Sequence, residues 1–324
     1  MKIKLSIIIP VYGVENFIEE CFHSLLPQVD ENVELIVVDD GCLDTSIDKL
    51  NILIDEYYSA KKDHIKIFSQ NNFGQSIARN NGIAISSGDY IAFIDPDDVV
   101  TENYINTILT EINSGETLDI LHFNAHQLDD ESGKFLEDIN LTKKNTNLIK
   151  NDSFLEKSFL KNMWYPWMRV IRAEIMKDYL FAPNIYLEDM NLFPEIYYDE
   201  RVQNIKEITE KIVIYRLRKN SSIRDPFNKK VIDGIDYGLK KFSKMNNRFY
   251  SILYNTLLLQ RVSLLFLQGK SFWFIYRYCN NHLKDVRLNY SFSKKIWFFK
   301  NFNFSYLILL KIKCLFLFKG FYNE

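Results

Sequence analysis

Three aspartates within four positions follow an apolar segment in "YIAFIDPDDVV", residues 90–100. Asp95, Asp97 and Asp98 place their charges where the pattern predicts the end of a buried strand. Aspartates at such a position often cap a helix or form an Asx-turn. Three carboxylates this close repel one another unless a cation compensates them, and Mg²⁺ or Mn²⁺ prefers oxygen ligands. Because these ions bridge to phosphate oxygens, the cluster predicts a site for a metal ion and a phosphorylated ligand.

A second acidic pair, Glu188 and Asp189, lies in "YLEDMNLF" (186–193). One interpretation is a carboxylate base that accepts a proton from a hydroxyl group. The other is an N-cap for the helix that the following residues predict, and both can hold at once.

Strand and helix patterns alternate ahead of and around these acids. Apolar runs at 5–10, 33–41, 65–70 and 90–95 predict strands, and helical spacing appears at 16–26, 45–58 and within 71–87. This alternation favours a parallel sheet with helices on both faces, and ligands of such folds bind beyond the carboxyl ends of the strands. Tyr12, Asp39 and Asp40 follow two of those strands. Residues 118–130 and 212–218 predict later strands, and the chain is largely helical from about 228.

Four separated segments resemble glycosyltransferase family 2: "SIIIPVYGVENFIEECFHSLLPQ", "VELIVVDDGCLDTS", "NNFGQSIARNNGIAISSGDYIAFIDPDD" and "YLEDMNLF". The resemblance covers roughly residues 3–223. It implies the GT-A fold, a Rossmann-like, mostly parallel sheet with helices on both faces. It also implies inverting sugar transfer from a nucleotide-sugar donor, for which UDP is preferred on family grounds.

The resemblance implies the following donor-side roles. Asp95-Pro96-Asp97 matches the family's Asp-X-Asp, with Asp97 expected to contact Mn²⁺ or Mg²⁺ and Asp95 or Asp98 to contact metal or donor sugar. Asp40 is expected to accept a hydrogen bond from the N–H group of the nucleobase, and Asp39 is the next candidate for this contact. Arg79 either approaches the phosphates or anchors its helix through carboxylates. The remaining donor-site positions are Pro10, Val11, Tyr12 and Gly74.

On the acceptor side, the resemblance implies that Asp189 is the general base, with Glu188 beside it. Trp164 and Trp167 either present an aromatic face to a sugar acceptor or lie in the core. Arg218 or Arg224 is expected to close over the diphosphate. Where the family commonly has Ser-Thr-Asp after "VDDG", this chain has Cys42-Leu43-Asp44.

Charge and composition limit the remaining possibilities. A net charge of -2 over 324 residues argues against general nucleic-acid binding. Four widely separated cysteines and the lack of a signal-peptide pattern predict a cytoplasmic protein. Residues 287–323 contain seven Lys or Arg, many aromatics and no acid, which predicts peripheral attachment to the inner face of the plasma membrane. A packed subdomain that binds a partner subunit, including a homo-oligomer, is the alternative.

The sequence therefore predicts a GT-A domain over 1–225, with a donor half (1–100) and an acceptor half (101–225), and a helical, basic-aromatic region over 226–324. The leading hypothesis is a hexosyl- or N-acetylhexosaminyl-transferase that extends a lipid-linked surface glycan such as lipopolysaccharide, O-antigen or capsule. A sugar nucleotidyltransferase is disfavoured because "IIIPVYGVENF" lacks a glycine-rich basic loop. A non-catalytic glycan-binding or scaffold protein is disfavoured by the retained acids.

Overall fold

The computed structural model describes residues 3–115, 117–218, 225 and 227–283. The chain forms two compact units. The sheet unit comprises Met1–Asp152, Met163–Asn184 and Glu188–Lys219, and the helical unit comprises Ser153–Asn162, Ile185–Leu187 and Asn220–Glu324. A domain boundary at residue 225 stays a prediction, but two short internal segments group with the C-terminal helices, which the sequence patterns did not indicate.

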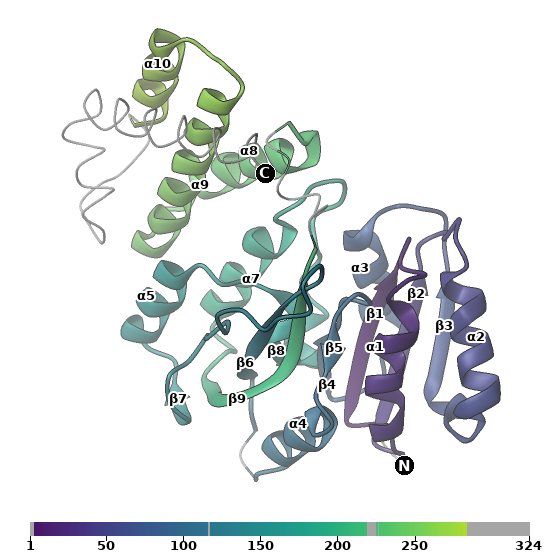
Figure 1. The fold of residues 1–324 in the computed structure, drawn as a ribbon. Helices are drawn as coiled ribbons and strands as arrows, with labels where there is room; N and C mark the ends of the chain where they lie inside the picture. Colours follow the sequence, from purple (N-terminus) through teal and green to yellow (C-terminus); the bar gives the residue numbers. More distant parts are fainter. Residues whose placement is uncertain (1–2, 116, 219–224, 226, 284–324) are drawn as a thin grey trace. The chain divides into compact units, whose positions relative to one another are not determined.

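The sheet unit alternates strands and helices along most of its length (Figure 1). Its elements are β1 (Leu5–Val11), α1 (Ile18–Leu25), η1 (Leu26–Gln28), β2 (Val33–Asp39), α2 (Ser46–Tyr57), η2 (Ser59–His64), β3 (Ile65–Ser69), α3 (Gln75–Ile85), β4 (Tyr90–Phe93), β5 (Val99–Val100), α4 (Tyr104–Ile112), β6 (Ile120–Asp129), β7 (Thr146–Ile149), η3 (Pro166–Met168), β8 (Arg169–Arg172), α6 (Ala173–Met176), α7 (Glu188–Tyr198) and β9 (Asn204–Leu217).

These strands form one sheet in the order β3-β2-β1-β4-β8-β6-β9-β5, with β7 paired to β9. Strands β3, β2, β1 and β4 are mutually parallel, and β8 joins β4 in the antiparallel sense. Because β6 is antiparallel to β8 and parallel to β9, strands β6 and β9 run in the direction of β4. The sheet is therefore mostly parallel, as predicted, and β1, β2 and β4 end at the same edge.

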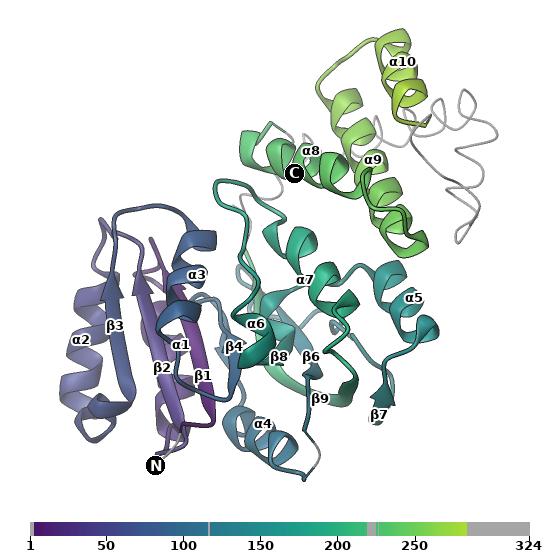
Figure 2. The same ribbon diagram turned by 180° about the vertical axis from the view of Figure 1, so that it is seen from behind.

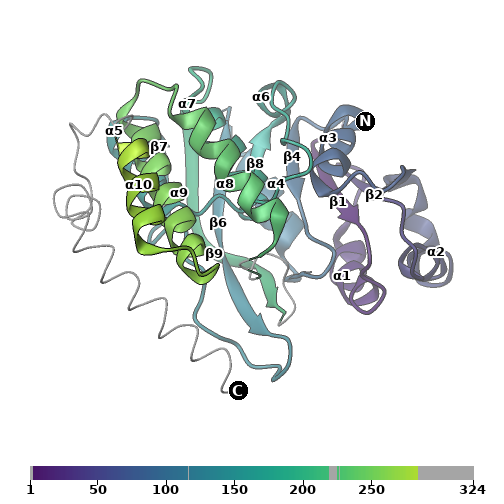
Figure 3. The same ribbon diagram turned by 90° about the horizontal axis from the view of Figure 1, so that it is seen from above.

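Alternating side chains of β1 divide the core into two layers. Ile7 and Ile9 belong to the layer that includes buried residues of α1, α2 and α4. Helix α3 packs on the opposite face, and Figures 2 and 3 show α3 and α1 on opposite sides of β1. The predicted covering of both sheet faces is confirmed. It arises because β1 and β2 are buried along almost their whole length and are apolar except at Ser6, Glu34 and Asp39.

The later strands depart from the prediction in their extent. The strand predicted at 212–218 is the C-terminal half of β9, which begins at Asn204 because polar residues alternate with buried ones along its first half. The strand predicted at 118–130 is β6 and ends at Asp129. Strand β8 has only four residues and was not predicted, since its sequence "RVIR" contains two charged residues in a sheet interior.

The helical unit contains α5 (Asp152–Lys161), α8 (Lys229–Phe242), α9 (Arg248–Leu267) and α10 (Phe272–Leu283). Asn228 and Asn247 cap α8 and α9 by accepting hydrogen bonds from backbone N–H groups. The length and apolar composition of α9 would suffice to cross a membrane, but half of its most apolar window is buried within the protein. It packs against α8 and α10, as a core helix does. The tail predicted to bind membrane, 287–323, lies outside the described residues.

Candidate active site

The carboxyl edge of β2 carries two aspartates with different surroundings. Asp40 is 3% exposed, and its carboxylate accepts hydrogen bonds from Gln70 Nε2 (2.7 Å), Phe73 N (2.8 Å) and Gly74 N (2.8 Å). Asp39 is less buried, and its carboxylate accepts a hydrogen bond from Cys42 N (2.9 Å). Asp40 therefore holds the loop before α3, and Asp39 has the carboxylate that is open to a ligand.

The remaining predicted donor-site positions differ in exposure and in backbone conformation. Pro10 and Val11 are buried in β1, whereas Tyr12, directly after the strand, is 46% exposed. Gly74 is the N-cap residue of α3 and has a φ of 89°, a positive value that glycine adopts without a steric penalty. The exposed Tyr12 ring can contact a planar ligand. Pro10 and Val11 are buried at the end of β1 and fix the backbone that carries Tyr12.

The aspartates after β4 are partly neutralised by arginine. The side chains of Asp95 and Asp97 are 28% and 16% exposed. Arg218 Nη2 lies 2.6 Å from Asp97 Oδ2, and its guanidinium group also lies over the Phe17 ring. Burial and the negative charge of Asp95 raise the pKa of Asp97 above its ordinary value.

Asp98 has a structural position, in contrast to the expectation that it contacts metal or donor sugar. It is 1% exposed, and its Oδ1 accepts from Arg216 N (2.8 Å), which joins the end of β4 to β9. Its Oδ2 has no hydrogen-bond partner among the described residues. Burial, with the charges of Asp97 and Asp95, raises its pKa well above the usual range. Asp98 is thus a buried acid behind the two more exposed carboxylates.

Arg79 joins the donor-side acids to the second acidic pair. Its Nη1 lies 2.5 Å from Glu188 Oε1, its Nη2 lies 2.8 Å from Asp95 Oδ1, and the side chain is 3% exposed. Gln75 Nε2 also donates to Glu188 Oε1 (2.7 Å). Of the two roles left open by the sequence, the structure thus describes the carboxylate anchor. This buried pairing connects residues that lie 93 positions apart, Asp95 and Glu188.

Asp189 lies in the first turn of α7, next to this pairing. Its Oδ1 accepts from the N–H of the next residue, Met190 (2.6 Å). Because α7 already begins at Glu188, both acids lie inside the helix and not at the predicted N-cap position. Burial raises the pKa of Asp189, opposed by that hydrogen bond and by the charges of Arg79 and Arg169. Burial also raises the pKa of Glu188 to about 7, even though Arg79 opposes the change. A carboxylate with a raised pKa is a better proton acceptor, as a general base requires.

The two tryptophans are core residues in the structure. Trp164 and Trp167 are 3% and 2% exposed. Trp167 is stacked between Tyr165 and Tyr215, with ring centroids 5.1 Å and 5.2 Å away. Tyr165 is 39% exposed, and partial burial, with the charge of Asp189 as a second cause, raises its pKa. The solvent-facing ring of this segment is therefore Tyr165, which the sequence interpretation did not select.

Sequence reasoning also missed Gln75 and Arg216. Arg216 donates to Asp97 O, Asp130 and Glu20, and so anchors the turn that carries the aspartates. The only earlier indication was its position in "YRLR", beside Arg218. Arg224 lies outside the described residues.

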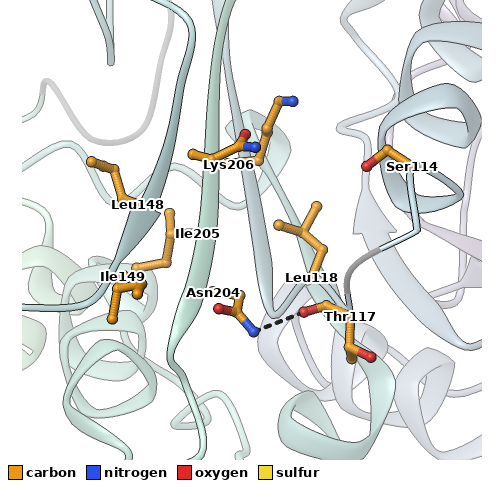
Figure 4. Close-up of a pocket in the computed structure, with 9 residues that line it drawn as sticks. Ser114, Thr117, Leu118, Leu148, Ile149, Asn204, Ile205 and Lys206 are labelled. Carbon is orange, nitrogen blue, oxygen red and sulfur yellow. Dashed lines mark hydrogen bonds between the residues drawn. The ribbon is translucent and has the colours of Figure 1, made fainter.

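A small surface pocket lies elsewhere in the sheet unit (Figure 4). Asn204 Nδ2 donates to Thr117 O (3.1 Å) there, and Ile205 and Lys206 belong to the first residues of β9. Because β9 runs in the direction of β4, this pocket lies at the edge of the sheet opposite Asp95 and Asp97. It contains none of the predicted site residues.

A metal site made of protein ligands alone is not found in the described part of the chain, where no three His, Cys, Asp or Glu side chains converge to hold an ion. Asp95 and Asp97 are nevertheless hard oxygen ligands with partly exposed carboxylates. These two groups fit a divalent ion that takes its other ligands from a bound phosphate group and water.

The fold, with a cluster of acids at the carboxyl edge of its sheet, is that of a GT-A protein. The structure resembles that of S. aureus TarS 1-349 in complex with UDP-GlcNAc, with a TM-score of 0.67 and 16% identity over 96% of this chain and 89% of that chain. A second TarS structure, in complex with UDP, has a TM-score of 0.66.

The family model described as Glycosyl transferase family 2 matches residues 6–180, and the chain belongs to this family. It is 31% identical to the uncharacterized glycosyltransferase YibD of Escherichia coli over 53% of this chain and 49% of YibD. It is 29% identical to the uncharacterized glycosyltransferase EpsJ of Bacillus subtilis over 76% of this chain and 70% of EpsJ. The matched region spans about half of YibD, and 32% of GlyA of Streptococcus pneumoniae, which is 28% identical.

Proposed function

We propose that this protein is an inverting glycosyltransferase that uses a UDP-sugar. The observation that carries the proposal is the Arg79 pairing, which holds the acids after β4 and the Glu188–Asp189 pair in one cluster. Phosphate binding needs the first set, and proton removal needs the second. The similarity to TarS, whose structure was solved in complex with UDP-GlcNAc, supports UDP as nucleotide and a hexose or N-acetylhexosamine as the transferred sugar.

In the proposed donor complex, Asp39 accepts a hydrogen bond from the uracil N–H group and Tyr12 lies against the ring. Asp97 and Asp95 are the residues that would hold Mn²⁺ or Mg²⁺ beside the diphosphate. The bound ion would supply charge stabilisation to the departing diphosphate. Arg218 adds a positive charge from the protein at the same point, since its guanidinium group already lies against Asp97.

In the proposed reaction, Asp189 takes the proton of the acceptor hydroxyl. The acceptor oxygen forms a bond to the anomeric carbon from the face opposite the diphosphate. The bond between that carbon and the diphosphate oxygen breaks, its electron pair leaves with UDP, and the configuration inverts. Glu188 and Arg79 orient the first turn of α7 while this occurs, because their contact fixes the residue beside the base.

For the acceptor, we propose a lipid-linked surface glycan, with Tyr165 as the aromatic platform for its terminal sugar. The exposed ring and its electrostatic link to Asp189 support this position. The basic, aromatic tail supports attachment to an anionic membrane on its cytoplasmic face. Self-association of the helical unit is the alternative role for that tail.

The decisive experiment is a panel of nucleotide sugars tested for binding and hydrolysis with Mn²⁺, Mg²⁺ or EDTA. We expect metal-dependent binding of one UDP-sugar, lost in Asp97→Asn, and loss of turnover with retained binding in Asp189→Asn. Folded protein that binds no nucleotide sugar in any condition would refute the donor site. Donor binding by a wild-type protein that turns over neither water nor any glycan acceptor would favour a non-catalytic binding protein.

A further inference from the structure

Helix α8 approaches one short segment of the chain unusually closely. An ideal Cβ atom placed on Gly234 would lie 1.9 Å from the carbonyl oxygen of Tyr186, a separation at which the backbone must shift. Tyr186 N donates to Lys230 O (3.0 Å), and Lys230 Nζ lies 5.7 Å from the centre of the Tyr186 ring. One turn of α8 thus contacts Tyr186 through its N–H, its carbonyl and its ring. All of these residues belong to the helical unit.

The presence of glycine here needs a packing reason. A glycine in a helix interior destabilises the helix relative to alanine. Gly234 is buried in the middle of α8. The Tyr186 carbonyl occupies the space of its missing side chain, so the close approach accounts for the residue.

The contacted segment leads directly into the acids. Tyr186 is followed by Leu187 and then by Glu188 and Asp189, the first residues of α7. Leu187 has a φ of 63°, a left-handed conformation that is unfavourable for a bulky residue and persists only where the surroundings impose it. The backbone that enters α7 is therefore held in an unfavourable conformation immediately after the point where α8 contacts it.

We propose that α8 is a positioning element for the general base, and that Gly234 and Tyr186 are its positioning residues. The inference rests on the proposed function, because it gives the C-terminal region a role in that reaction. Contact at Tyr186 fixes the entry of the chain into α7, and only one residue separates it from Glu188.

The test is Gly234→Ala in the full chain, with Asp233→Ala as matched control. Asp233 is exposed on the same turn, so its replacement adds the same helix propensity without crowding Tyr186. Accommodating the new methyl group requires a movement of roughly 1 Å, and misplacement on that scale can cost ~10²-fold in rate. We expect kcat to fall at least tenfold in Gly234→Ala, with donor affinity and metal dependence unchanged, and no change in Asp233→Ala.

Hydrogen–deuterium exchange measures the same effect without catalysis. Amide exchange over 185–190 should become faster in Gly234→Ala and stay unchanged in Asp233→Ala. If the wild-type chain transfers no sugar, the proposed function fails, and this measurement still decides whether α8 fixes the segment. Unchanged exchange and unchanged kcat in folded Gly234→Ala would overturn the proposal.

A second variant covers the case in which Gly234→Ala does not fold. Leu187→Gly relieves the left-handed conformation, and it uncouples Tyr186 from the acids by adding backbone freedom. We expect Leu187→Gly to fold, to bind donor as the wild type does, and to lose at least tenfold in kcat. Full kcat in Leu187→Gly would mean that the segment's position is set within α7 itself, and the role of α8 would be rejected.

Discussion

Replacing Arg79 with methionine should destabilise the protein strongly, and more so at high pH. Methionine keeps the length of the side chain but leaves Asp95 and Glu188 without the guanidinium that lies 2.8 and 2.5 Å from them. Removing one partner of a buried ion pair typically costs ~3–5 kcal/mol, because the remaining charge is buried and uncompensated. Arg79 and Glu188 are 3% and 4% exposed, so this range applies without a reduction for solvent screening.

The pH dependence follows from Glu188. Its pKa rises from 4.5 to about 7 on folding, so the folded state holds the proton more tightly than the unfolded state does. The resulting stabilisation is fully present below pH 4.5 and is lost as pH rises to about 7. Without Arg79, which lowers that pKa, the loss should extend to higher pH. The difference in stability between Arg79→Met and wild type should therefore be larger at about pH 8 than at about pH 5.

Urea unfolding at both pH values measures this prediction, with Arg201→Met as the matched control. Arg201 also pairs with two carboxylates, Asp178 and Asp199, but its side chain is 39% exposed. Solvent screening makes exposed pairs weak, so the control should lose much less stability. An Arg79→Met loss no greater than that of the control, or one that is independent of pH, would refute the role given to the buried pairing.

Three further predictions concern the reaction. The pKa of Asp189 is raised and the general base must be ionised, so kcat should increase with pH over a range that lies above the ordinary aspartate pKa of 3.8. Asp189→Asn should lower kcat ~10²–10⁴-fold without weakening donor binding. Arg218→Ala should tighten donor-free Mn²⁺ binding, measured by electron paramagnetic resonance, because Asp97 loses its competing guanidinium; weaker Mn²⁺ binding would contradict the competition. Asp39→Asn should weaken donor binding with little effect on the free energy of unfolding, whereas Asp40→Asn should lower stability as well. If Asp40→Asn weakens donor binding without lowering stability, and Asp39→Asn lowers stability, then Asp40 is the residue that contacts the nucleobase.

The sequence predicted the first half of the fold well because the signal there is local. Strands β1 and β2 are mainly apolar runs that are followed directly by polar residues, so their identity and their shared edge follow from the local sequence. The same reasoning placed Asp39, Asp95 and Asp97 beyond that edge. Strand β8 could not be found, because its four residues are held in the sheet by β4 and β6 on either side.

Side-chain roles were harder to predict where burial decides them. Asp39 and Asp40 are chemically identical neighbours, and only the path of the loop at Gln70–Gly74 determines which carboxylate accepts hydrogen bonds from the backbone N–H groups of that loop. Asp98 likewise looks like Asp97 in sequence, yet its contact with Arg216 depends on where β9 returns to the sheet. Tyr165 was not selected because the neighbouring Trp164 and Trp167 have larger aromatic faces, and the sequence alone does not show that both are buried.

Charge balance joins these observations to the proposed chemistry. Five carboxyl groups belong to the site, namely Asp95, Asp97, Asp98, Glu188 and Asp189, while two guanidinium groups, Arg79 and Arg218, pair with them. Burial, together with the charges of neighbouring acids, raises the pKa of four of these acids, namely Asp97, Asp98, Glu188 and Asp189. A divalent ion at Asp97 would lower the excess of negative charge by two charges and bind a diphosphate without further basic residues. The arginine that now compensates Asp97 would then be released toward the same diphosphate, so metal and donor should bind with mutual reinforcement. Independent binding of Mn²⁺ and UDP, measured by titrating each in the presence of the other, would contradict this account.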